Sequence, residues 1–402
     1  MSSVGWAEAR TLAYTAGWSA RPPAVEVPLA QADGMTLAAP LTTLTDLPAF
    51  PTSSVDGYAV RGAGPWRIAG SVLAGSVAPE LAEGDCVEIA TGAMVPADAS
   101  AVVRVEDSTI GTDGRVSGEP RPVRDWRDPG DEAHQGEELL PAGTTVTPGV
   151  IGLAAACGHD SLRVTPSIPT AIVIFGDELL TAGPPERGRI RDALGPQLPG
   201  WLARLGGAVV PEFAPLGPIE DTLDAHVEAI RKALEGADLV CTTGGTMHGP
   251  VDHLHPALAA LGARYIANTV GVRPGFPMLL ASLTVGDRTK FIAGLPGNPQ
   301  SAIVALTSLV EPLLAGLTGR PAPTAGRVTL GAEIPGRGDH THLSLVRVEP
   351  DGLAYPLAHS GSAMLRGLAR ADGFAVIPPG TAGSAGDEVA LLRLPILPGT
   401  RP

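Results

Sequence analysis

The pattern of apolar and polar residues changes character twice along the 402-residue chain. Near the start, apolar spacing predicts a helix over residues 4–16, followed by an extended, proline-rich piece. From about residue 55 to 140, short apolar runs alternate with Gly, Asp and Pro turns at roughly ten-residue spacing, which is typical of an all-β module. Short strands return from about residue 322, and they predict a second, smaller β domain.

Between these β regions, strands alternate with helices. The predicted elements are strand 171–174, helix 194–205, strand 208–210, helix 221–234 and strand 239–242. Alternation of this kind indicates a parallel α/β sheet, in which ligands bind beyond the carboxyl ends of the strands.

The chain is too long for one ordinary core, so we expect several domains. The patterns predict a central parallel α/β domain with β domains on either side of it in the sequence. The expected boundaries are 1–55 with 140–168 for an N-terminal domain, 56–139 for an inserted β-rich module, 169–321 for the α/β domain and 322–402 for the C-terminal β domain.

Composition and charge argue against several classes of function. The net charge of −14 argues against non-specific binding to nucleic acid or to an anionic membrane. No uncharged apolar run reaches about 18 residues, the length that a membrane span needs. Cys86, Cys157 and Cys241 are far apart and lack CxxC spacing, so they predict buried thiols in a reducing compartment. We therefore expect a soluble, cytoplasmic protein.

The segment Phe291–Ser301 predicts a strand, a Pro-Gly-Asn-Pro turn and the start of a helix. Pro299 suits the first turn of that helix, where its missing N–H is no loss. Asn298 suits the N-cap, where its side chain can bind an otherwise free N–H. The remaining N–H groups and the helix dipole could bind an anion or a phosphate. The alternative is an ordinary strand–turn–helix connection.

Carboxylates and glycines follow two other predicted strands. Asp177 and Glu178 come after one, and Asp252 lies in a glycine-rich loop after another. Gathered carboxylates could bind Mg²⁺, which typically takes one or two of them together with substrate phosphates. The alternative is that they cap helices. Gly244 and Gly245 allow close approach of the backbone to an anion.

Five segments together carry a family resemblance over nearly the whole chain. They are PAFPTSSVDGYAV at 48–60, FGDEL at 175–179, TGGTMHGPVD at 243–252, RPGFP at 273–277 and FIAGLPGNPQS at 291–301. In this order and spacing they resemble the MoeA-type molybdopterin molybdenumtransferases, the family that includes the gephyrin E domain. The LPGNP and VDGYAV blocks are the most specific.

The resemblance implies a fold and an activity. The central domain would be MogA-like and the N-terminal region elongated. The activity would be insertion of molybdate into adenylylated molybdopterin during molybdenum cofactor biosynthesis, with Mg²⁺-dependent release of AMP. The resemblance also implies a homodimer and a molybdopterin adenylyltransferase as a partner.

The resemblance also assigns residues to roles. The catalytic set is Asp56, Asp177, Glu178 and Asp252, of which Glu178 and Asp252 would hold Mg²⁺. The pterin-binding set is Asp192, Gly244, Gly245, Thr246, Pro296, Gly297, Asn298, Pro299 and Ser301. The molybdate set is Arg273, Arg347 and Ser362. An arginine fork suits an oxyanion, although an exposed arginine can also be a solvated surface charge. Asp56, likewise, could simply form a turn.

Several positions depart from the family pattern. Phe276 replaces a lysine, Phe175 a small hydroxyl residue, Leu194 an asparagine, and Glu132 stands where an aspartate is common. Around 218–219, where many members carry an aspartate, there is none. His248 is either a ligand contact or an exposed loop residue. The departures indicate altered specificity or lost catalysis, so the alternative is a degenerate paralogue acting as a pterin-binding or interaction protein.

Overall fold

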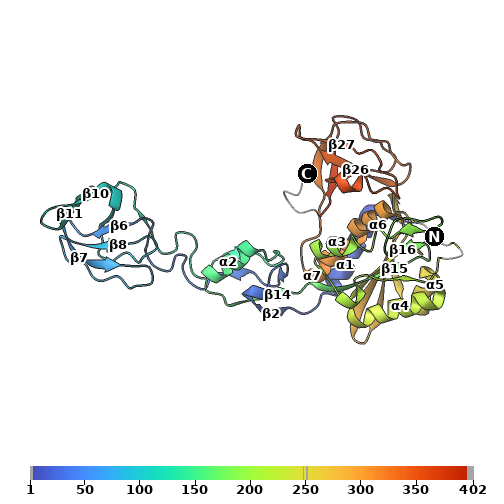
Figure 1. Ribbon diagram of the computed structural model, residues 1–402, viewed down its shortest axis with the longest axis horizontal. Helices are drawn as coiled ribbons and strands as arrows, with labels where there is room; N and C mark the ends of the chain where they lie inside the picture. Colours follow the sequence, from blue (N-terminus) through green and yellow to red (C-terminus); the bar gives the residue numbers. More distant parts are fainter. Residues whose placement is uncertain (1–2, 248, 250–251, 396–402) are drawn as a thin grey trace. The chain divides into compact units, whose positions relative to one another are not determined.

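A computed structural model describes residues 3–247, 249 and 252–395. The chain divides into two compact units (Figure 1). The first comprises the described residues of 1–25, 34–38 and 164–402, and the second comprises 26–33 and 39–163. This division is coarser than the four domains expected from the sequence, whose boundaries remain a prediction.

A seven-stranded sheet forms the centre of the first unit. Its strands in spatial order are β18 (Gly207–Val209), β15 (Ile168–Phe175), β20 (Leu239–Thr243), β24 (Arg288–Leu295), β23 (Leu279–Val285) and β21 (Arg264–Asn268), with β19 (Leu216–Ile219) also paired to β15. Strands β18, β19, β15, β20 and β24 are mutually parallel, as the sequence predicted. Buried parallel strands read as continuous apolar runs, which is why β15 and β20 were visible in the sequence.

Strands β23 and β21 are antiparallel to their neighbours, which the sequence pattern did not indicate. Only Gly286 and Asp287 lie between β23 and β24, and Gly286 has a φ of 63°. A two-residue turn with positive φ joins antiparallel strands, whereas a parallel pair needs a crossover of a dozen residues or more. The sheet is therefore mixed at this edge.

Helices cover both faces of the central sheet (Figure 1). One face carries α1 (Trp6–Ser19), α3 (Leu198–Arg204), α6 (Pro299–Ala305), the π-helical turn η4 (Leu306–Val310) and α7 (Glu311–Thr318). The other face carries α4 (Leu223–Gly236) and α5 (Leu254–Ala260), with the short η3 (Pro211–Phe213). Side chains of β15 alternate between the two cores: Ile172 and Ile174 point to the first, and Ala171 and Val173 to the second.

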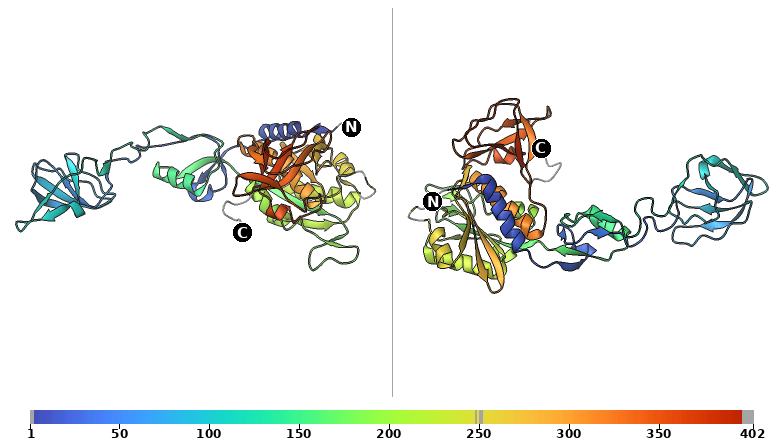
Figure 2. Two further views of the ribbon diagram at one scale, coloured as in Figure 1. Left: turned by 90° about the horizontal axis from the view of Figure 1, so that it is seen from above. Right: turned by 180° about the vertical axis from the view of Figure 1, so that it is seen from behind.

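Residues 299–318 form one continuous helical segment through α6, η4 and α7. Length and apolarity alone would allow it to cross a membrane, but 94% of the apolar window is buried inside the protein, as in a core helix. Helix α1 packs against α7, as Figure 2 shows. Gly17 and Gly316 lie at this crossing, where a Cβ on either would collide with the backbone of the other helix.

A second seven-stranded sheet in the first unit contains the C-terminal β domain. Its order is β1 (Val4–Gly5), β22 (Val270–Arg273), β26 (Thr341–Val348), β27 (Leu353–Pro356), β25 (Gly326–Leu330), β29 (Glu388–Arg393) and β28 (Gly373–Ile377), and β26 also pairs with β28. The parallel pairing of β22 with β26 places Arg273 directly opposite His342. This pairing joins a loop of the α/β region to the β domain, so Arg273 and His342 line the same cavity.

Short elements complete the first unit. They are β3 (Thr36–Leu37), which pairs with Val164 and Thr165 at the end of β14 (Ser161–Thr165), β16 (Leu179–Leu180) paired with β17 (Ile190–Arg191), and η5 (Leu368–Arg370). The first three residues of β14 belong to the second unit. Strand β2 (Val25–Pro28) spans the division between the units in the sequence.

The second unit contains the β-rich module. Its six-stranded sheet has the order β10 (Ser108–Ile110), β11 (Arg115–Gly118), β7 (Trp66–Val72), β8 (Asp85–Ile89), β6 (Gly57–Val60) and β9 (Ala101–Arg104). The smaller elements are β4 (Leu41–Thr42) with β13 (Glu138–Leu140), β5 (Thr52–Ser53) with β12 (Trp126–Arg127), η1 (Leu29–Gln31), η2 (Val105–Asp107) and α2 (Pro148–Ala156).

All three cysteines are buried and free, as expected from their spacing. Burial raises the pKa of the Cys86 thiol to about 11 and that of Cys241 to about 12. At neutral pH both remain thiols, which are poor nucleophiles and poor metal ligands.

Candidate functional site: two adjoining pockets

Two pockets adjoin one another in the first unit. The acidic pocket, of about 550 Å³, lies at the carboxyl ends of β15, β20 and β24 and is lined by Glu178, Asp192 and Asp252. The basic pocket, of about 760 Å³, is lined by Arg273 and Arg337. Both are also lined by Pro277, Pro296 and Asn298, so the two cavities share a wall.

The acidic pocket brings together most residues that the resemblance assigned to the pterin, and with them Glu178 and Asp252 of the catalytic set. The pterin residues in its wall are Asp192, Gly244, Gly245, Thr246, Pro296, Gly297, Asn298 and Pro299. Gly244 and Gly245 have φ angles of 83° and 65°, a conformation that side chains other than glycine rarely adopt. The Gly-rich loop therefore bends sharply at the pocket, with no side chain at the two glycines themselves.

The three carboxylates differ in what already binds them. Asp192 is 8% exposed and accepts hydrogen bonds from Leu194 N at 2.9 Å and Gly195 N at 3.0 Å, so it stabilises its own turn. Among the described residues, Asp252 accepts a side-chain bond from Gly249 N, to Oδ2 at 2.6 Å. Asp252 therefore keeps an acceptor oxygen for a ligand, and Glu178 projects from the turn after β15 into the same pocket.

Asp177 does not line the acidic pocket. Its N–H donates to Asp221 Oδ2 at 3.3 Å, and Asp221 N donates to Asp177 Oδ1 at 3.4 Å. Asp177 thus fixes a turn, and Asp221 provides an aspartate two residues beyond 218–219, where none was expected. The sequence did show Asp221, but only as the beginning of a helix.

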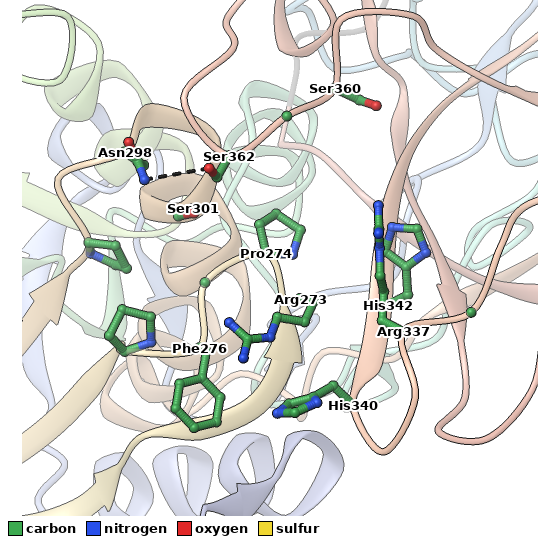
Figure 3. Close-up of a pocket in the computed structure, with 15 residues that line it drawn as sticks. Arg273, Pro274, Phe276, Asn298, Ser301, Arg337, His340, His342, Ser360 and Ser362 are labelled. Atoms are coloured by element: carbon green, nitrogen blue, oxygen red, sulfur yellow. Dashed lines mark hydrogen bonds between the residues drawn. The ribbon is translucent and has the colours of Figure 1, made fainter. Parts of the chain in front are cut away.

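In the basic pocket, Phe276 contacts two potential cations (Figure 3). The guanidinium carbon of Arg273 lies 4.7 Å from the centroid of the Phe276 ring. The His340 ring meets the same phenyl ring edge to face, with centroids 5.3 Å apart. Phe276 removes the charge of the expected lysine, but its ring face attracts and orients the guanidinium that remains.

Three residues of this pocket were missed from the sequence: Arg337, His340 and His342. They come from the loop before β26 and from β26 itself. Burial lowers the pKa of His342, and its Nδ1, which donates to Pro335 O at 2.7 Å, opposes that shift. His342 is therefore neutral near pH 7, which leaves Arg273 and Arg337 as permanent cations in the described wall. A turn-rich Gly-Arg-Gly-Asp-His run was the available signal, but it reads equally as a surface turn.

The structure does not bring Arg347 to either pocket. It lies five positions beyond His342 on β26, opposite Tyr355 of β27, and its Nε lies 3.4 Å from Glu349 Oε1. The other two members of the predicted molybdate set, Arg273 and Ser362, do line the basic pocket, together with Ser301.

The start of α6 differs from the expectation. Asn298 occupies the N-cap position but its side chain makes no capping bond; its Nδ2 lies 3.5 Å from Ser362 Oγ instead. Gln300 N and Ser301 N donate to the backbone oxygen of Ser362 at 2.9 and 3.3 Å. The loop that carries Ser362 therefore caps this helix, and the two N–H groups expected to bind an anion are already occupied.

The remaining sequence candidates lie elsewhere. Asp56, in the second unit, accepts from Thr91 N at 2.6 Å and from Thr91 Oγ1 at 2.9 Å, and these bonds lower its pKa. Within that unit Asp56 fixes a turn. Glu132 is also in the second unit, where its N–H donates to Leu47 O. His248 lies outside the described residues.

The described residues contain no group of three or more His, Cys, Asp or Glu side chains that could hold a metal ion. Glu178 and Asp252 are two carboxylates in one pocket, which fits an ion that takes its other ligands from water and substrate phosphates.

Comparison with known families accounts for most of the chain. Residues 4–158 match the MoeA N-terminal region (domain I and II), 171–316 a probable molybdopterin binding domain, and 327–394 the MoeA C-terminal region (domain IV). Molybdopterin molybdenumtransferases of Bacillus subtilis and Synechococcus elongatus are each 30% identical to this chain. Each alignment covers 89% of this chain; it covers 87% of the Bacillus subtilis protein and 92% of the Synechococcus elongatus protein.

Solved structures agree with the sequence comparison. Two crystal structures of molybdopterin biosynthesis MoeA proteins from Pyrococcus horikoshii superpose with a TM-score of 0.76 each, at 26% and 24% identity. The first superposition covers 98% of this chain and 100% of the crystallised chain, and the second covers 97% and 99%. The chain therefore belongs to the MoeA family of molybdopterin molybdenumtransferases.

Proposed function

We propose that this protein inserts molybdenum from molybdate into adenylylated molybdopterin, with Mg²⁺-dependent release of AMP. The observation that carries the proposal is the pair of adjoining pockets with opposite charge. One offers carboxylates and a glycine loop, and the other offers two arginines and several hydroxyl groups. The reaction needs a large phosphate-bearing substrate and a small oxyanion side by side, and two cavities with a shared wall meet that need.

The acidic pocket is assigned to the adenylylated pterin. Arg191 lines the same pocket and contributes one positive charge, but the three carboxylates outnumber it and repel a phosphoanhydride, so a bound cation would favour this assignment. Glu178 and Asp252 would hold Mg²⁺, which when bound neutralises phosphate charge and polarises the phosphoanhydride. The chain's own contribution is to fix both carboxylates on turns that follow parallel strands, while Gly244 and Gly245 leave room for the ligand.

The basic pocket is assigned to molybdate. Arg273 and Arg337 line this pocket from different elements, and Ser301 and Ser362 add hydroxyl groups. Guanidinium groups bind tetrahedral oxyanions through paired N–H donors. Neutralising the repulsion between two bound anions, and holding them in contact, is the main service that a protein can provide to this reaction.

The same proposal includes a cytoplasmic homodimer that receives its substrate from a molybdopterin adenylyltransferase. The Asp56 turn would then lie near the acidic pocket of a second copy. Buried, free cysteines are consistent with that compartment.

The test is to incubate the purified protein with adenylylated molybdopterin, Mg²⁺ and molybdate, and to measure AMP and metal-containing cofactor together. The proposal predicts AMP release that requires molybdate and is lost in Asp252→Ala. Tight binding of the pterin without AMP release would contradict it.

The second candidate is a pterin-binding or interaction protein that has lost turnover. Phe276 in the basic pocket favours it, because an aromatic ring stands where the family carries a lysine. A charge-assisted hydrogen bond contributes roughly 1.5–3 kcal/mol, so losing one costs a factor of about ten or more. Pterin binding with no AMP release at any molybdate concentration would select this candidate.

A further inference from the structure

A buried histidine lies directly behind the acidic pocket. His226, in the first turn of α4, is 0% exposed. Neither of its ring nitrogens has a hydrogen-bond partner within the described residues. Buried polar atoms are nearly always hydrogen-bonded, so an orphaned imidazole calls for an explanation.

The flat faces of His226 and Phe175 are in contact. Their ring centroids are 3.6 Å apart and the ring planes differ by 11°. Phe175 is the last residue of β15, immediately before the turn that carries Glu178, and it lines the acidic pocket. The stack therefore supports the wall of the pocket from behind.

The edge of the His226 ring lies beneath the glycine loop. A Cβ added to Gly245 would sit 3.5 Å from His226 Cε1, which is ordinary contact distance. The ring of His253, which is the residue after Asp252 and the N-cap of α5, meets His226 edge to face with centroids 5.6 Å apart. His226 thus lies against the end of β15 and against the loop that follows β20.

A polar link completes the arrangement. His226 Nε2 lies 3.6 Å from Asp221 Oδ1, and Asp221 exchanges hydrogen bonds with Asp177, next to Glu178. Burial lowers the pKa of His226. The carboxylate of Asp221 opposes this shift most strongly, through its charge and its close approach to the ring, while His253 adds to the lowering and Asp177 opposes it. At 3.6 Å the contact with Asp221 is longer than a hydrogen bond. A small movement would bring Nε2 within hydrogen-bond distance of Asp221.

We infer that His226 is a positioning residue of the acidic pocket: its ring supports Phe175 and Gly245, and its Nε2 steers Asp221 and with it the turn that carries Asp177 and Glu178. The inference rests on the proposed function only for the test that measures AMP release. It concerns residues that touch the pocket wall and not the substrate.

The first test needs no ligand and uses NMR of the histidine ring protons in the full-length protein, with His226→Phe identifying the His226 signals. The inference predicts that these signals are shifted upfield by the Phe175 ring and that Phe175→Leu removes the shift. It also predicts that Asp221→Asn lowers the pKa of His226 further, because an opposing negative charge is gone. An unshifted signal, or a titration that Asp221→Asn leaves unchanged, would overturn the inference.

The second test measures AMP release against Mg²⁺ concentration. His226→Phe keeps a ring against Phe175 but removes the nitrogens, whereas Asp221→Asn keeps the shape and removes the charge. Residues that orient metal ligands change metal affinity by about 10–100-fold, so we expect both variants to need roughly tenfold more Mg²⁺ for half-maximal rate. Lys232→Gln, exposed on the same helix, is the matched control and should match the wild type.

The outcomes separate the two proposals. A lower thermal midpoint with unchanged Mg²⁺ dependence in both variants would mean that His226 is only structural, and would overturn the inference. A wild-type protein that releases no AMP would contradict the proposed function, and the NMR titration would then decide the inference alone.

Discussion

The acidic and basic pockets share a wall but are assembled in different ways. The acidic pocket consists mainly of turns that directly follow neighbouring parallel strands, so motifs along the sequence meet there by the logic of the sheet. The basic pocket depends on the pairing of β22 with β26, which brings Arg273 next to a β domain more than sixty residues away in sequence. Local pattern therefore brings most residues of the first pocket together but not those of the second, and departures from the family pattern fall in both: Phe175 and Leu194 line the acidic pocket and Phe276 the basic one.

The largest expected effect is in the acidic pocket. Asp252→Asn retains an oxygen that can accept the bond from Gly249 N, but it removes the charge. Loss of a charged contact worth roughly 1.5–3 kcal/mol corresponds to a drop in rate of about 10–150-fold. The rate of AMP release at fixed Mg²⁺ measures it. Glu220→Gln, which lines a neighbouring cavity and not the acidic pocket, is the control and should change the rate less than twofold.

The next effect tests the composition of the basic pocket. Arg273→Ala and Arg337→Ala should each raise the KM for molybdate by roughly 10–100-fold, because each removes one charge-assisted contact. Arg347→Ala removes an arginine of the same β domain that lines neither pocket, and should leave this KM within about twofold. The KM for molybdate in AMP release distinguishes them. A large effect at Arg347 and none at Arg337 would reverse our assignment.

Phe276→Lys should have a smaller effect of opposite sign. The substitution adds a cation to the basic pocket but removes the ring that holds Arg273 and His340. We expect a gain in molybdate affinity of up to about tenfold, reduced by the loss of that support. Equilibrium binding of molybdate or tungstate measures it. If the wild type is fully active and the variant is identical to it, then Phe276 does not limit the anion site.

The smallest effect concerns pH. The pKa of His342 is lowered in the folded protein, chiefly by burial, from an ordinary value of about 6.5. The unfolded chain therefore binds this proton more readily, and His342 reduces the free energy of unfolding as the pH falls below about 6.5. His342→Gln should lessen the loss of stability in that range and change little above it. Denaturant unfolding at pH 5 and pH 8 in both proteins provides the comparison.

Much of the fold could be predicted because it follows from local pattern. The strand–turn–helix around Asn298 is present, as are the buried strand β15 and the amphipathic helix α4. The turn between β23 and β24 reverses the sheet edge, which apolar runs alone do not reveal because a buried strand reads the same in either direction.

Residues of the candidate site differ in how much local sequence signal they carry. The resemblance singled out Glu178 and Asp252, and their positions after strands of one sheet explain why they line the same pocket. Arg347 was assigned from the family resemblance, whereas Arg337 has no specific sequence signal of its own, because the order of residues in the C-terminal domain does not tell which of them line the basic pocket. The capping of α6 by Ser362 O was also hidden, since a partner 62 residues away has no local signal.

The central claim is that the oxyanion binds between Arg273 and Arg337, beside the acidic pocket. Anomalous X-ray scattering from crystals soaked in tungstate, which replaces molybdate and scatters strongly, tests it most directly. The account predicts one strong peak in the basic pocket within hydrogen-bond reach of both guanidinium groups. A peak beside Arg347, or in the acidic pocket with the basic pocket empty, would contradict it.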